Sequence, residues 1–172
     1  MLTRLHKLIE YSGKSTAWLT TILVLLICLD VVLRYLFSAS QIWMTELEWH
    51  LFAIIFLIGA AYTFQQDAHV RVDLFYTNYS EKGKAWINLL GILLFLIPWT
   101  LVLIRASNKY AYYSFRIGET SPDPGGLPGR WLIKYAIVIA FVLLFIQGVL
   151  LAVRCIRVIL GREVTVFESE MD

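Results

Sequence analysis

Charged residues are scarce in this chain of 172 residues, and their scarcity excludes several classes of protein. Only 16% of the residues are Asp, Glu, Lys or Arg, whereas 59% are hydrophobic. Soluble domains typically contain about 25% charged and about 45–50% apolar residues. The composition therefore excludes a water-soluble enzyme, and the net charge of +2 is too small to indicate a nucleic-acid partner.

Cysteine and histidine are also rare, which argues against redox and metal chemistry. The two cysteines, Cys28 and Cys155, form no CxxC pair and are expected to be small apolar helix residues. His6, His50 and His69 are not expected to face each other at one depth inside the membrane, so no haem is predicted. No GxSxG, HExxH or glycine-rich phosphate loop occurs either. We therefore predict no catalytic residue, no metal site and no cofactor.

What the chain does contain is four long apolar runs. They extend over about 17–37, 47–64, 86–104 and 131–153, and each has roughly the 17–25 residues that cross a hydrocarbon core of about 30 Å. Because no water satisfies backbone groups in that core, the runs are expected to be helices. We predict an all-α membrane protein whose four transmembrane helices pack as one bundle and form a single domain over 1–172.

Lys and Arg residues indicate how the chain is oriented. They are more frequent before the first run, between the second and third runs and after the fourth than in the other two loops. This bias places both termini in the cytoplasm. Leu2, Leu5, Leu8 and Ile9 recur at helical spacing and predict a short N-terminal interfacial helix. The acidic tail after Gly161 is expected to be solvated.

Asp30 and Arg34 are the ionisable residues of the first run. They are four residues apart, so they share a helix face and can form an ion pair. Their presence, and the length of the run, favour a retained span over a cleaved signal peptide. Ionisable residues in a membrane can form a proton or ion relay, but a pair that only stabilises helix packing is the favoured interpretation here.

Glu46, Glu48 and His50 lie where the second run begins. Glu46 and His50 are four residues apart, a spacing that a metal pair on a helix could use. Only two ligands are available, and carboxylates in a first helical turn also complement the helix dipole. We favour acids that meet basic groups on a neighbour.

The most distinctive polar segment follows the second run. His69, Arg71 and Asp73 alternate with valines and would share one side of an extended strand. The segment is either a solvated, positively charged cytoplasmic loop or a structured clasp in which Arg71 and Asp73 pair with each other or with a partner. Spacing alone leaves both interpretations open.

Several short segments together resemble a known family. They are residues 32–37 (VLRYLF), 43–48 (WMTELE), 56–61 (FLIGAA), 67–73 (DAHVRVD) and a loop containing Glu119, Ser121, Pro122, Leu127 and Pro128. Their order is similar to that in the small membrane subunit, the DctQ-like component, of tripartite ATP-independent periplasmic (TRAP) transporters. HVRVD after a Gly-Ala-Ala helix is the most specific of these features, and the segments cover most of the chain from Val32 onward.

The resemblance implies a role that the apolar runs alone do not reveal. In this family a periplasmic binding protein captures an organic anion, often a dicarboxylate or a sialic acid, and a large multi-span subunit moves it inward, driven by sodium. The small subunit resembles a non-catalytic companion in the bacterial inner membrane that contacts lipid, braces the large subunit and helps dock the binding protein. Glu46, Glu48, Glu119 and Asp123 are then candidates for a negative rim facing that protein.

Small residues in the second run add one structural expectation, and two rival functions stay open. Gly59, with Ala60 and Ala61, allows close helix approach, either within the bundle or against the large subunit. The rival hypotheses are a stand-alone proton-coupled transporter that uses Asp30 as its titrating group, and the membrane anchor of a redox enzyme with bound haem or quinone.

Overall fold

The computed structural model describes residues 2–39, 41–66, 76, 79–163 and 165–166, with side chains described from residue 7 onward. Throughout these residues the regular structure is helical, and four helices are long and apolar enough to cross a membrane. The prediction of four membrane-spanning helices is thus confirmed. His69, Arg71 and Asp73 lie outside the described residues, so the choice between loop and clasp stays open.

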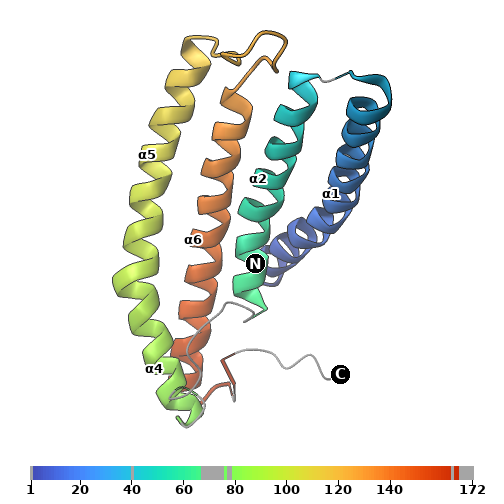
Figure 1. Cartoon of the computed structure of the whole chain (residues 1–172). Coiled ribbons are helices and arrows are strands. Elements are labelled where there is room, and N and C mark those ends of the chain that lie inside the picture. Colours follow the sequence, from blue (N-terminus) through green and yellow to red (C-terminus); the bar gives the residue numbers. More distant parts are fainter. Residues whose placement is uncertain (1, 40, 67–75, 77–78, 164, 167–172) are drawn as a thin grey trace.

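The helices are longer than the predicted apolar runs, because residues beyond each run continue the helix at one end or at both. In chain order they are α1 (Leu2–Phe37), α2 (Ile42–Gln65), α4 (Glu81–Gly91), the π-helical turn η1 (Ile92–Leu96), α5 (Ile97–Arg116) and α6 (Trp131–Ile159) (Figure 1).

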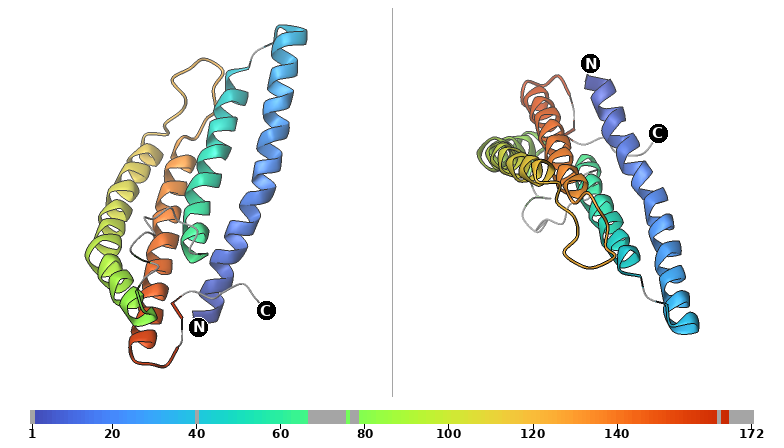
Figure 2. Two further views of the ribbon diagram at one scale, coloured as in Figure 1. Left: turned by 60° about the horizontal axis from the view of Figure 1, so that its bottom comes forward. Right: turned by 90° about the horizontal axis from the view of Figure 1, so that it is seen from above.

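The four spans pack side by side in an open row. Helix α5 packs on α6, α6 on α2 and α2 on α1, whereas α5 has no extensive contact with α1 or α2 (Figure 2). Helix α6 is therefore central, with 39% of its most apolar stretch buried, against 11% for α1. An open row is possible because lipid is as apolar as Leu, so nothing forces the exposed faces together.

We call the end of the row that holds the α1–α2 turn and residues 117–130 the loop end, and the opposite end the terminal end. The two antiparallel pairs, α1–α2 and α5–α6, meet where α2 runs beside α6 (Figure 1). The loop end therefore contains the start of α2, the end of α5 and the start of α6.

Helix α1 is one continuous helix, so the expected N-terminal interfacial helix is not a separate element. Its 36 residues extend about 54 Å at about 1.5 Å per residue. This is longer than the hydrocarbon core of about 30 Å, so the helix is tilted or its first turns lie outside the core.

Small residues let α1 cross α2 near the terminal end. A methyl group added at Gly13 would lie 2.2 Å from Cγ of Tyr62, so the two helix backbones are in close contact there. Ala61 is fully buried beside this crossing, where Ile9 and Leu150 also pack. Gly59, by contrast, faces open space. Of the predicted small-residue segment, Ala61 serves packing within the chain and Gly59 does not.

Helices α4, η1 and α5 form one curved column (Figure 1). The π-helical turn is followed by Pro98, which has no N–H to donate, and both features bend helices. Leu96 of this turn packs tightly on α6, because a methyl group at Gly148 would lie 2.7 Å from its Cδ2 atom.

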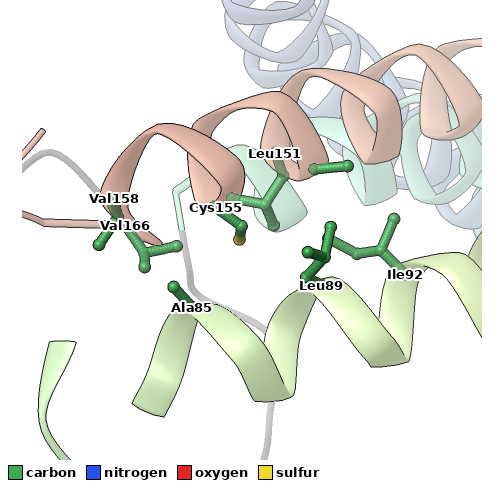
Figure 3. Close-up of a cluster of buried hydrophobic side chains, with 8 residues drawn as sticks. Ala85, Leu89, Ile92, Leu151, Cys155, Val158 and Val166 are labelled. Atoms are coloured by element: carbon green, nitrogen blue, oxygen red, sulfur yellow. The ribbon is translucent and has the colours of Figure 1, made fainter. Parts of the chain in front are cut away.

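The terminal end has a buried apolar cluster that includes part of the tail. Ala85 and Leu89 of α4 face Cys155 and Val158 of α6, and Val166 closes the cluster with 1% of its surface exposed (Figure 3). The expectation of a solvated tail is therefore wrong at Val166, because an apolar side chain folds back onto the helices after α6 ends.

Gly13→Ala is expected to lower stability, because the new methyl group forces α1 and α2 apart. Overpacking of this kind typically costs about 1–3 kcal/mol, and the melting temperature in detergent is the measurement. Gly59→Ala is the matched control, since its methyl group enters open space. Equal melting temperatures for the two variants would contradict the crossing.

Candidate functional site

The carboxylate of Glu46 is the centre of the loop end. Glu46 lies in the first turns of α2, and only 4% of its surface is exposed. Its Oε1 atom accepts hydrogen bonds from Ser121 Oγ at 2.5 Å and from Arg130 Nη2 at 2.9 Å, and its Oε2 atom accepts from the Leu127 amide at 2.5 Å. One side chain thus binds both halves of the α5–α6 loop.

Gly126 makes this approach possible. A methyl group on Gly126 would lie 2.7 Å from Oε2 of Glu46 and 2.3 Å from Oγ of Ser121, so a larger residue could not occupy the position without displacing the loop. The Ser121 amide donates to the Leu127 carbonyl at 3.1 Å and closes the loop on itself. The loop is therefore a fixed structure that is anchored on α2.

A second ion pair fixes the base of the same loop. The Lys134 ammonium donates to Glu119, and the ring of Tyr110 lies 3.9 Å from Lys134 Nζ. The hydrogen bond from Lys134 is the main reason that the pKa of the Glu119 carboxyl lies below its usual value of 4.5. The Arg130 amide also donates to the Glu119 carbonyl at 3.0 Å, which joins the end of α5 to the start of α6.

Aromatic rings surround the anchored loop. The Arg130 guanidinium lies 5.8 Å from the ring of Trp49, which itself packs on His50 with 3.8 Å between centroids. His50 Nδ1 lies 2.5 Å from the backbone carbonyl of Glu46. The Glu46 carboxylate points at the loop, so the two side chains considered as a metal pair have different partners.

Asp30, Arg34 and Glu48 form a separate cluster between α1 and α2. Arg34 donates to Oδ2 of Asp30, as the i, i+4 spacing predicted, and Asp30 is 2% exposed. Glu48 is close enough to interact electrostatically with both residues. Asp30 Oδ1 and Glu48 Oε1 are buried without a hydrogen-bond partner among the described residues. The cluster fits a helix-packing contact, because its charges lie in the α1–α2 interface.

The predicted negative rim is mostly turned inward. The structure engages Glu46 and Glu119 in ion pairs within the chain, and Glu48 interacts electrostatically with Asp30 and Arg34. Asp123 remains exposed at the loop tip, next to the exposed Pro122. Glu46 and Glu119 do meet basic groups, but those groups belong to the chain itself: Arg130, immediately before α6, and Lys134 of α6.

The sequence singles out several of these residues as candidates but does not predict which of them contact one another. Ser121 and Leu127 both touch Glu46, and Glu119 pairs close by, whereas Pro128 is exposed. Arg130 and Lys134 were missed as partners. Glu46 and Arg130 are 84 positions apart in the chain, and no local spacing signals such a pair.

These features define a small multi-pass membrane protein with paired charges at one end of its helices. A comparison with family models identifies it further: the model of the DctQ component of tripartite ATP-independent periplasmic transporters matches residues 23–158. This match covers most of the chain, and the protein belongs to that family. A comparison with individual curated proteins gives no match.

Glu46→Gln is expected to loosen the loop. A neutral amide no longer offers two acceptor oxygens, and it leaves Arg130 without its anion. Backbone amides of residues 121–127 should exchange with solvent roughly tenfold faster or more, measured by hydrogen–deuterium exchange. Asp123→Asn, in the same loop but exposed, should exchange like the wild type. Equal exchange in both variants would contradict the role of Glu46.

Glu119 predicts a pH dependence of stability. Its pKa is lowered in the folded state, so its contribution is fully present above the unfolded value of 4.5 and is lost as pH falls through the folded value. Glu119→Gln should therefore lose less stability than the wild type when detergent melting curves are recorded from about pH 7 to about pH 3. Asp123→Asn should show the same dependence of melting temperature on pH as the wild type. If Glu119→Gln also showed the wild-type dependence, the contribution assigned to Glu119 would be contradicted.

Proposed function

We propose that the chain is the non-catalytic subunit that braces the larger transport subunit of a sodium-coupled TRAP transporter for organic anions of the dicarboxylate or sialic-acid class. Membership of the DctQ family supports a TRAP transporter component with a larger membrane partner and a binding protein. The observation that carries the bracing role is the open row of helices (Figure 2). A row exposes more apolar surface than a closed bundle, and a partner can pack along its length.

The loop end faces the periplasm in this proposal, and both termini face the cytoplasm. The Lys and Arg residues of the terminal end support this orientation by the positive-inside rule. The anchored loop then stands where a periplasmic binding protein docks. Its tip, around Pro122 and Asp123, is exposed while its base is held by Glu46. A rigid loop binds with a smaller entropy cost than a mobile one.

The bracing role has a mechanical reason. A transport domain that moves through the membrane needs a stationary neighbour, and a wide protein footprint resists being dragged along. The row supplies width, and the charges between its helices at the loop end form ion pairs within the chain: Asp30 with Arg34, Glu46 with Arg130 and Glu119 with Lys134. Asp30 therefore acts as a packing residue in this proposal, in place of the titrating group of a stand-alone transporter.

Co-purification and uptake test this function together. The tagged chain, extracted gently from its native membranes, should retain a much larger multi-span protein in stoichiometric amount. Uptake of the organic anion should be lost without the chain and restored by it, and the purified chain alone should transport nothing in liposomes. A homo-oligomer with no large partner would contradict the proposal, and bound haem or quinone would support the redox-anchor alternative.

Asp30→Asn separates bracing from proton coupling. The substitution removes the buried anion that pairs with the half-exposed Arg34 side chain between α1 and α2, so less complex should assemble, and uptake should fall in proportion to the complex that remains. Uptake per assembled complex is the measurement. Loss of transport with complete assembly would instead favour the stand-alone transporter.

A further inference from the structure

One face of α5 has three basic residues between the middle of the helix and the loop end. Arg105, Lys109 and Arg116 are all exposed, and their spacing of four and then seven residues places them within about 40° of each other around the helix. Tyr112 lies on the same face and is 53% exposed. Helix α5 contains no acidic residue at all.

This face points away from the rest of the chain. The buried residues of α5 are Thr100, Ala111 and Ser114, which lie on the other side of the helix, toward α6. Helix α5 is also an outer member of the row (Figure 1). The three basic side chains thus project sideways from the free edge of the protein.

No acidic residue of the described part of the chain pairs with them. The other basic residues of the loop end are engaged: Arg34 with Asp30, Arg130 with Glu46 and Lys134 with Glu119. The α1 edge therefore has its charge compensated within the chain, whereas the α5 edge does not. Uncompensated Lys and Arg are also uncommon in the short periplasmic loops and helix ends of such proteins.

The length of this basic face along α5 indicates the kind of partner. Eleven residues separate Arg105 from Arg116, a rise of about 16 Å along the helix. The headgroup layer of one leaflet is only about 5–8 Å thick, so one layer of lipid phosphates is too thin to contact all three basic residues. Arg and Tyr side chains are, in addition, enriched at the centres of protein interfaces.

We propose that Arg105, Lys109, Tyr112 and Arg116 form a docking surface for an acidic, periplasm-facing patch of the larger membrane subunit, which stands beside α5. This inference rests on the proposed function, which supplies the orientation and the partner. It adds which edge of the row the partner covers and the charge of the partner's surface. The α1 edge then faces lipid.

A variant with Arg105→Gln, Lys109→Gln and Arg116→Gln tests the surface. After a wash at low salt, where exposed ion pairs are least screened, it should retain roughly tenfold less of the large subunit than the wild type does, the combined effect of losing three exposed ion pairs. The matched control is Lys7→Gln, Lys82→Gln and Arg162→Gln, three exposed basic residues at the terminal end. The control should retain as much as the wild type, and both variants should melt at the wild-type temperature.

Zero-length cross-linking tests the contact without any substitution. A carbodiimide joins the Lys109 amine to a carboxyl group as an amide while the reagent takes up the water, so a product forms only where the two groups touch. Mass spectrometry should find Lys109 joined to an Asp or Glu of the large subunit, and Lys82 not joined to it. Lys109→Glu should abolish the product, and replacing the identified carboxylate by Lys should restore retention to that variant.

These experiments separate a failure of the docking surface from a failure of the proposed function. If the wild type retains the large subunit but the triple Gln variant retains it equally, the docking surface is wrong and the bracing function stands. Lys109 joined to the binding protein, or a variant that loses only anionic phospholipid, would also overturn the inference. If the wild type retains no large subunit, the proposed function itself fails.

Discussion

The buried carboxylate of Glu46 is the interaction on which the loop end depends. It lies on α2, and its hydrogen-bond donors come from the α5–α6 loop and from Arg130, immediately before α6. It therefore joins the α1–α2 pair to the α5–α6 pair at a level where water and headgroups would otherwise compete. A buried anion needs such donors, because an unpaired charge in a low-dielectric environment is costly. The same requirement keeps the loop in one conformation.

The two ends of the row are held by different forces. At the loop end, ion pairs and hydrogen bonds fix the connections between helices. At the terminal end, close packing does so: Gly13 admits the ring of Tyr62, and Val166 completes an apolar cluster. Each helix makes most of its contacts with its neighbours in the row, since lipid does not drive apolar faces together. The result is a wide, thin protein whose edges differ in charge.

Much of the secondary structure follows from the sequence because a membrane constrains it strongly. Four apolar runs become four helices, since each backbone group must find its partner inside its own segment. The Asp30–Arg34 pair also follows from the sequence, because residues four positions apart are neighbours on a helix. The helix ends are less well predicted, because α2 begins at Ile42, five residues before the predicted run, and its first turns include the polar Thr45 and Glu46.

The sequence by itself thus determined the class of protein, the number of spans and the family, because hydropathy and short motifs are local properties of the chain. Only the tertiary structure decided that the helices form an open row and that Glu46 and Glu119 turn inward to Arg130 and Lys134. It also decided that the basic face of α5 has no acidic partner among the residues that the structure describes. These features depend on which residues meet across the chain. In a membrane the apolar pattern does not specify that, because every apolar face is equally satisfied by lipid.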